Sequence, residues 1–295
     1  MLFMSYTIQI ADVNDERTES ELRTLIKAAF DSATLLPPGH LKRNISSNAS
    51  QSSFFLVAIE DNQIIGCNAF LAYDFTLKDQ VYVGYQSCWS ATHPAHQGKK
   101  VFVTIINEAK KMLKSQGAGF LYGIPNNTSL PIFTKKLEFS ETPAMMSRVF
   151  NIPFFQNFFL SEKSLHSLED AFIVNEDQVM RHKLLQSPTA IKQVSHKKST
   201  LWGKSSSKSR YGLNIPYFEL GGIQLADVGD LRFLINAIFE EHKPWFIQVI
   251  SCQTNTYNGL FKRWTNAHMN GFIFYNLNMP KYKNFNIMIG TIDVF

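Results

Sequence analysis

The residues best suited to chemistry lie between Ser90 and Phe102, where an apolar strand leads through a turn into a helix. The first turn of a helix leaves backbone N–H groups without partners and carries the positive end of the helix dipole. Phosphate groups bind at such positions, and Gly98 would let the backbone approach a ligand closely. Lys99 and Lys100 add positive charge. This pattern predicts either a phosphate site or an ordinary strand-to-helix turn with two solvated lysines.

A different chemistry would be nucleophilic catalysis by Cys88 with His93 or His96. A lone cysteine in a strand is more often a small core residue, and we favour that interpretation. Tyr85 and Tyr122 could each supply a hydroxyl, although tyrosines in strands usually pack into the core. The 8 histidines are scattered, so the sequence predicts no metal site.

The elements that must position the turn can be derived from apolar periodicity and from capping residues. Asp15 or Thr18 can cap the first helix, and Asn127 or Thr128 can cap the helix that follows the strand at 120–124. In the first half we expect strands over 6–11, 54–59, 64–73, 81–92, 120–124 and 139–149, and helices over 15–30, 101–116 and 127–136.

Length and composition describe a folded protein of one large domain or two ordinary ones. The chain has 295 residues, of which 45% are hydrophobic and 18% charged, and its net charge is +5. The longest apolar stretch, 150–160, is interrupted by polar residues and is too short to span a membrane. Three scattered cysteines and the lack of a secretion signal over 1–11 predict a cytoplasmic location.

The second half repeats the order of the first. Asn127-Thr128 and Asn255-Thr256 each follow a helix and a short apolar strand, and they predict two equivalent capped helices, the second over 254–267. The basic stretch 192–210 is expected to form an exposed hairpin with a serine-rich turn. Strands are expected over 217–225, 245–252, 271–277 and 286–295, a helix over 227–242, and a packing element over 150–167. The predicted domains are 1–150, a connecting segment 151–175, and 176–295.

The run THPAHQGKKVF at 92–102 resembles the acetyl-CoA loop of the GNAT N-acetyltransferase superfamily. Asn126-Asn127 and the run FTKKLEF at 133–139 resemble a later motif of the same family. The resemblance covers the first half and implies direct attack of a neutral amine on an acyl-CoA thioester. It implies that pantetheine pairs with the backbone of Ser90, Ala91 and Thr92, that the amides of Gln97, Gly98, Lys99, Lys100 and Val101 hold the pyrophosphate, and that Asn127 reaches the pantetheine or the acyl end.

The sequence departs from the family pattern at positions that matter for catalysis. Lys100 stands at the second glycine of the loop, and Glu138 stands at the glycine before the final aromatic residue. Phe133 and Thr134 occupy the region where a catalytic tyrosine is common, and the strand 81–92 has no acidic residue to serve as a base. The remaining catalytic candidates are Gln86, Ser87 and Tyr122.

The sequence therefore predicts an α/β (α+β) protein of two tandem GNAT-like domains, each a mixed, mostly antiparallel sheet flanked by helices. It resembles bacterial acyltransferases associated with surface polysaccharides. The second copy is degenerate, because the short acidic segment 226–229 replaces the cofactor loop. We expect acyl-CoA-dependent N-acylation, typically N-acetylation, of an amino sugar or another small amine, with acetyl-CoA or another acyl-CoA as co-substrate, no metal, no nucleic acid and no membrane span. Two alternatives stay open: a catalytically inactive binding or scaffold protein, and an aminoacyl-tRNA-dependent transferase.

Overall fold

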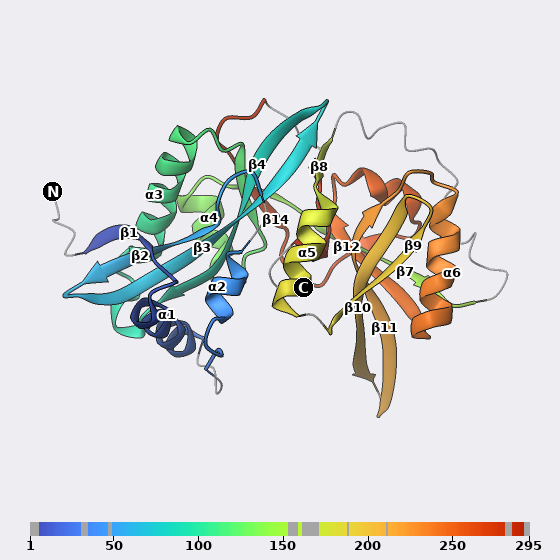
Figure 1. Ribbon diagram of the computed structural model, residues 1–295, viewed down its shortest axis with the longest axis horizontal. Coiled ribbons are helices and arrows are strands. Elements are labelled where there is room, and N and C mark those ends of the chain that lie inside the picture. Colours follow the sequence, from blue (N-terminus) through green and yellow to red (C-terminus); the bar gives the residue numbers. More distant parts are fainter. Residues whose placement is uncertain are drawn as a thin grey trace. The chain divides into compact units, whose positions relative to one another are not determined.

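A computed structural model describes residues 6–30, 35–46, 49–152, 159–160, 171–187, 189–210, 212–280 and 285–291 (Figure 1). The chain forms two compact units. Unit one consists of Met1–Asp74, Tyr82–Glu141 and Ile273–Lys281, and unit two consists of Phe75–Val81, Thr142–Phe272 and Tyr282–Phe295. The expected mixed α/β architecture, with two sheets flanked by helices, is confirmed.

Unit one is built on a sheet with the strand order β1-β2-β3-β4-β5-β14-β6. The strands are β1 (Thr7–Ala11), β2 (Phe54–Glu60), β3 (Gln63–Leu77), β4 (Gln80–Thr92), β5 (Phe120–Gly123), β14 (Phe272–Asn276) and β6 (Ser140–Thr142). The first three strands pair antiparallel, whereas β4 and β5 run parallel. Helix α3 (Val101–Ser115) makes the connection that this parallel pair requires.

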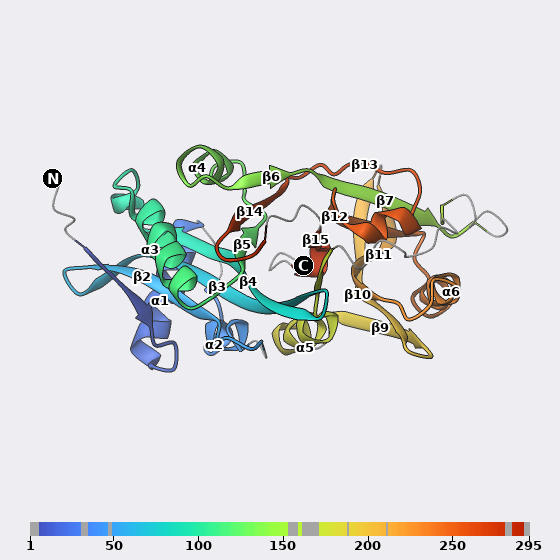
Figure 2. The same cartoon turned by 90° about the horizontal axis from the view of Figure 1, so that it is seen from above.

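Helices cover both faces of this sheet (Figure 2). Alternate β2 side chains point to opposite faces, because the side-chain period of a strand is two. Phe55 packs with α1 (Glu16–Ala29) and α2 (His40–Asn44), whereas Leu56 packs with α3 and α4 (Leu130–Lys136). The predicted cap of the first helix is confirmed, since the Asp15 carboxylate accepts a hydrogen bond from the Thr18 amide at 2.9 Å.

Unit two has a second sheet, with the strand order β13-β7-β12-β11-β10-β9. Its strands are β7 (Ala144–Phe150), β9 (Ile191–His196), β10 (Ser199–Arg210), β11 (Leu213–Gln224), β12 (Phe246–Cys252) and β13 (Thr265–Asn266). It also has two short strands, β8 (Phe172–Val174) and β15 (Phe285–Asn286), which pair with each other. β11 and β12 run parallel, and helix α6 (Asp230–His242) connects them, as α3 connects β4 and β5. Helix α5 (Glu176–Gln186) precedes these strands.

Each sheet takes one strand from the other half of the chain. β14, from the C-terminal half, pairs antiparallel with β5 in the first sheet (Figure 2). β7, from the N-terminal half, pairs antiparallel with β12 in the second sheet. From β2 to β6 the order of the first sheet then matches that of the second, because β14 occupies the same place beside β5 that β7 occupies beside β12, whereas β1 has no counterpart in the second order. Each compact unit therefore combines segments from both halves of the chain.

Three expectations for the second half were wrong. The range 254–267 does not form one helix but contains the short 3-10 helix η4 (Thr256–Leu260) and then β13. The three serines at 205–207 lie inside β10, not in a turn, because they pair with β11 along their whole length. The range 286–295 begins with the end of β15 and continues into the 3-10 helix η5 (Ile289–Thr291). The element expected over 150–167 lies largely outside the described residues.

No helix among the described residues is long and apolar enough to cross a bilayer. All three cysteines, Cys67, Cys88 and Cys252, are free thiols. Nowhere in the described ranges do three histidine, cysteine or acidic side chains gather as they would around a metal ion.

Candidate functional site

The site begins where β4 separates from β5. The two strands pair only from Gly84 opposite Phe120 to Gln86 opposite Tyr122, and β4 then continues without β5. Along the rest of β4 no other described strand takes the place of β5. Backbone N–H and C=O groups of β4 are therefore left for a ligand that runs alongside, since unpaired strand groups need a partner.

A left-handed residue and a buried amide shape this part of β4. Trp89 has a φ of +50°, which is costly for a bulky residue. The rings of Trp89 and His40 make an edge-to-face contact, with their centroids 5.6 Å apart. The Asn68 side chain is fully buried on β3, and its Oδ1 accepts hydrogen bonds from the hydroxyls of Ser87, at 3.1 Å, and of Ser90. Asn68 therefore positions two side chains of the separating strand.

The turn after β4 is held by short-range hydrogen bonds. The His93 amide donates to Ile65 O at 2.9 Å, and the His93 ring nitrogen Nδ1 accepts from the Ala95 amide at 3.3 Å. A short 3-10 helix, η1 (Pro94–His96), follows. The His96 ring nitrogen Nδ1 lies 3.1 Å from a Glu60 carboxylate oxygen, which ties the turn to the end of β2.

Two amides of the turn point to no acceptor in the described part of the chain, those of Gly98 and Lys100. The amides of Gln97 and Lys99 donate within the turn, at 3.3 and 3.4 Å. Gly98 has a φ of +81°, and Lys100, with a φ of +62°, is the left-handed residue immediately before α3. This backbone leaves donors at the start of α3 for an anion.

The turn, the end of β4 and the start of α4 surround a cavity of about 500 Å³. Its charged side chains are those of Lys100 and Lys136, and no acidic residue lines it within the described chain. A positively charged hollow at a helix N-terminus suits an anionic ligand. The lining residues are Ala29, Phe30, Ser90, Ala91, Thr92, His96, Gln97, Gly98, Lys100, Val101, Phe102, Val103, Asn126, Thr128, Ser129, Ile132 and Lys136.

The start of α4 differs from its prediction. The helix begins at Leu130, after Ser129, and the side chain that organises its entry is Asn126 rather than Asn127 or Thr128. Asn126 Oδ1 accepts from the amides of Thr128 at 3.1 Å and Ser129 at 2.8 Å. The segment NNTS therefore folds as a side-chain-stabilised turn before the helix starts.

Most of the predicted cofactor residues lie around this one cavity. Seven line it: Ser90, Ala91, Thr92, Gln97, Gly98, Lys100 and Val101. Lys99 and Asn127 do not line it, whereas Asn126 does. Sequence reasoning missed Asn68, although a single amide side chain within the apolar run 64–73 was a visible signal of a buried polar role.

The catalytic candidates lie beside the cavity rather than in its lining. Gln86 and Tyr122 sit opposite each other at the last β4–β5 pair, and both are fully buried. Burial raises the pKa of the Tyr122 hydroxyl well above its usual value, and the nearby Cys88 adds to this. The Tyr122 hydroxyl therefore stays protonated at neutral pH. Ser87 donates its hydroxyl to Asn68.

In unit two, the turn between β11 and α6 corresponds to the turn between β4 and α3, and two aspartates lie at the start of its helix. Asp227 Oδ1 accepts the Gly229 amide at 2.7 Å at the start of α6. The Ser199 hydroxyl donates to Asp230 at 2.7 Å, and this bond and the nearby Lys197 lower the pKa of the Asp230 carboxyl. Carboxylates already occupy the positive end of this helix, which disfavours a phosphate there.

Lys100→Gly is expected to stabilise the protein by about 1 kcal/mol, because glycine adopts the left-handed backbone without the cost that lysine incurs. The matched control is Lys99→Gly, which removes the same charge at a position without positive φ and should be neutral or destabilising. Urea unfolding midpoints of both variants test this expectation, and equal shifts would contradict it.

Comparison with known proteins supports the sequence resemblance. Residues 14–140 match the family model of the acetyltransferase (GNAT) domain. None of the curated proteins matches the sequence. Solved structures share the fold. A GCN5-related N-acetyltransferase from Anabaena variabilis is similar with a TM-score of 0.64 and 9% identity, and the match covers 92% of this chain and 73% of that chain. Eis1 from Mycobacterium abscessus is similar with a TM-score of 0.59 and 9% identity, and the match covers 92% of this chain and 74% of that chain. A GCN5-related N-acetyltransferase from Kribbella flavida is also similar, with a TM-score of 0.52 and 9% identity, over 93% of this chain and 72% of that chain.

Proposed function

We propose that the protein is an acyl-CoA-dependent N-acyltransferase that binds acyl-CoA at the turn between β4 and α3. The observation that carries the proposal is the combination of a separated β4 edge with free amides at Gly98 and Lys100 around one cavity without acidic residues. The GNAT domain match over 14–140 contains all of these residues.

The residues present fit an acyl-CoA in two places. The backbone of β4 from Ser90 to Thr92 offers groups that pair with pantetheine amides, as a neighbouring strand would. The amides of Gly98 and Lys100, with the Lys100 and Lys136 ammonium groups, suit a pyrophosphate. Lys99 and Asn127 remain predicted contacts outside the cavity lining.

The chemistry that acyl-CoA supplies is an activated acyl group on a thioester. An amine must lose its proton before it attacks the carbonyl, because an ammonium group has no lone pair. No carboxylate lines the described cavity, so the acceptor amine arrives neutral or gives its proton to water. Gln86, Ser87 and Tyr122 remain the catalytic candidates, but the burial and raised pKa of the Tyr122 hydroxyl make it a poor proton donor to the departing thiolate.

The acceptor in this proposal is a small amine, with an amino sugar as the first compound to test, and acetyl is the first acyl group to test. A cytoplasmic location remains a prediction from cysteine usage. The second unit is proposed to be a degenerate copy of the first, which is supported by the matching strand orders and by the acidic closure of its turn.

Gly98→Val is expected to weaken acetyl-CoA binding at least about tenfold, because it strains the turn and places a branched side chain where the pyrophosphate would lie. Gly117→Val is the matched control: Gly117 has a φ of +79°, against +81° for Gly98, and a Cβ at either position meets no atom within 4 Å. Gly117 follows the other end of α3. Isothermal titration of the full chain measures both affinities.

Two outcomes would overturn the proposed cofactor site. One is no heat of binding from the unaltered protein at millimolar acetyl-CoA. The other is equal acetyl-CoA affinity for the Gly98→Val and Gly117→Val variants, which would place any binding away from this turn.

A protein that binds acyl-CoA without transferring the acyl group is the second candidate function. It is favoured by the cavity lining, which has no acidic residue in the described chain, and by the full burial of Tyr122. Thiol release from acetyl-CoA, followed with a thiol-reactive dye across a panel of amino sugars and small amines, separates the two functions. Acetyl-CoA binding without thiol release from any amine would favour the binding protein.

A further inference from the structure

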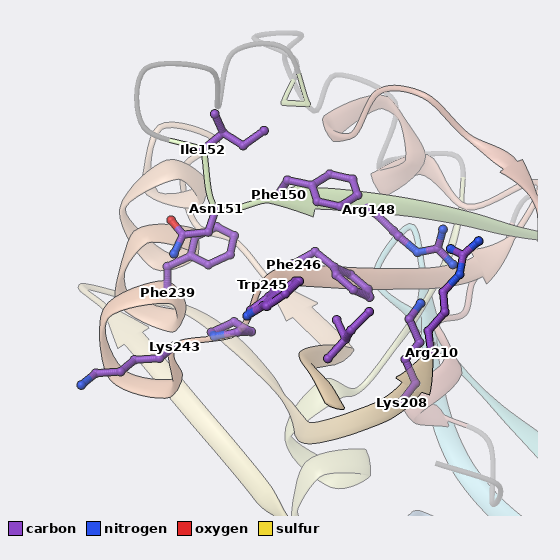
Figure 3. Close-up of a pocket in the computed structure, with 12 residues that line it drawn as sticks. Arg148, Phe150, Asn151, Ile152, Lys208, Arg210, Phe239, Lys243, Trp245 and Phe246 are labelled. Atoms are coloured by element: carbon purple, nitrogen blue, oxygen red, sulfur yellow. The ribbon is translucent and has the colours of Figure 1, made fainter. Parts of the chain in front are cut away.

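Unit two has a cavity of about 530 Å³ that the proposed acyl transfer does not use (Figure 3). The strands β7, β10, β11 and β12 and the end of α6 supply its walls. The lining residues that could contact a ligand include Arg148, Lys208, Arg210, Phe150, Trp245 and Phe246. The volume lies within the range of small-molecule sites.

One end of the cavity carries three cations, Arg148, Lys208 and Arg210 (Figure 3). No acidic residue lines the cavity in the described part of the chain. Partial burial lowers the pKa of the Lys208 ammonium, and the charges of Arg148 and Arg210 lower it further. The orphaned guanidinium of Arg148 and the Lys208 ammonium, beside Arg210 in a cavity that no described acid lines, make a site that an anion would stabilise.

The acidic residue Glu219, on the neighbouring strand β11, already has partners of its own. Glu219 pairs with Lys204 at 3.3 Å, and it accepts from the Gln248 amide at 3.4 Å. Arg148, whose backbone lies opposite Gln248, places a guanidinium Nε in a buried position where no described residue accepts its proton. Its one hydrogen bond within the described chain is a weak one, to the Met146 sulfur at 3.4 Å.

The cations lie against an aromatic surface. The Lys208 Nζ is 4.7 Å from the centre of the Phe246 ring, and the Arg148 guanidinium carbon is 5.5 Å from it. Beside them, the large apolar side chains of Phe150, Ile152 and Trp245 are 38%, 45% and 56% exposed. Exposed apolar groups and cations that line the same cavity mark a binding surface rather than scattered surface residues.

We propose that this cavity binds a small organic phosphate whose body is aromatic, with Arg148, Lys208 and Arg210 holding the phosphate and Trp245 and Phe150 contacting the body. Three cations match a doubly charged phosphate better than a singly charged carboxylate. A small molecule is favoured over a nucleic acid because the cations meet at one cavity instead of forming a stripe. Two other lysines nearby in the sequence already form ion pairs. Lys204, on β10, pairs with Glu219, and Lys197, in the turn between β9 and β10, pairs with Asp230.

The test is isothermal titration of the full chain with phenyl phosphate, inorganic phosphate, benzoate and phenol. Phenyl phosphate should bind more tightly than each of the other three. Arg148→Met and Lys208→Met should each weaken phenyl phosphate binding at least about tenfold, because each removes a charge-assisted contact. Trp245→Ala should weaken phenyl phosphate binding and leave inorganic phosphate binding unchanged.

Two control variants locate the effect. Lys192→Met removes an exposed cation of β9 outside the cavity and should leave phenyl phosphate binding unchanged. Gly98→Val alters the proposed acyl-CoA turn in unit one and should also leave it unchanged, so this proposal and the acyl-CoA proposal fail separately. Arg148 has a buried Nε atom, whereas Lys208 is only partly buried, so the Lys208→Met variant is informative even if Arg148→Met lowers folded yield.

Four results would overturn the proposal. They are equal binding by the Lys208→Met and Lys192→Met variants, loss of binding in Gly98→Val, benzoate binding as tight as phenyl phosphate binding, and a short single-stranded oligonucleotide that binds more tightly than phenyl phosphate with a steep salt dependence. The last result would identify a nucleic-acid surface instead.

Discussion

Replacing Gly222 by alanine is expected to lower the free energy of unfolding by about 2–5 kcal/mol. Gly222 lies on β11 directly opposite Trp202, whose indole is 1% exposed and donates to Glu176 Oε2 at 3.0 Å. A Cβ at this position would overlap the Glu176 carboxylate and lie 2.6 Å from Trp202 Cε2. The ring has no free space to move into, so the substitution forces apart a buried hydrogen bond as well as packed atoms.

Gly259→Ala is the matched control, because a Cβ there meets no atom within 4 Å. It should change stability by no more than about 0.5 kcal/mol. Urea unfolding of both variants, followed by tryptophan fluorescence, measures the difference. Equal midpoints would mean that the contact between Trp202 and Glu176 contributes little to unit two.

Glu176→Gln is expected to remove a pH dependence of stability between about pH 4.5 and pH 8. Glu176 is buried, with 8% of its surface exposed, and burial raises the pKa of its carboxyl group to about 8 from 4.5, although the Trp202 hydrogen bond opposes the shift. The folded state therefore keeps this proton over a pH range in which the unfolded chain loses it. The stabilisation is complete below pH 4.5 and is lost as pH rises through 8.

The size of this effect is up to about 5 kcal/mol, since one pKa unit corresponds to about 1.4 kcal/mol. Unfolding midpoints of the unaltered protein should fall from pH 5 to pH 8, whereas those of Glu176→Gln should fall less, so that the variant is the more stable at pH 8. The exposed Glu240→Gln is the control and should follow the unaltered protein. Parallel pH profiles for all three proteins would contradict the expectation.

Local signals predicted the elements that hold the proposed cofactor site. The Asp15 cap and the helix expected over 101–116 lie where the sequence indicates, and the left-handed Gly117 follows the end of that helix. These features depend on neighbours within one or two helical turns, so a single sequence contains them. The same holds for the turn at Gly98, whose residue types suit the backbone that the structure has.

The features that sequence reasoning missed depend on distant partners. The sequence predicts strands over 139–149 and 271–277, but it does not say that β7 and β14, which form there, each join the sheet of the other half. Serines 205–207 are typical of a turn, yet pairing with β11 keeps them in a strand. The role of Asn68 follows from Ser87 and Ser90 on a neighbouring strand, which no local pattern reveals.

The exchange of β14 and β7 bears on the order in which the chain can fold during synthesis. β5 and β6 leave the ribosome long before β14, which must pair beside them to complete the first sheet. Until then the edge of β5 lacks its strand partner, and an unpaired edge can recruit wrong partners. The half of the protein that is made first is therefore completed only near the end of synthesis, and nascent chains that end before residue 272 lack a strand of the sheet that carries the proposed acyl-CoA site.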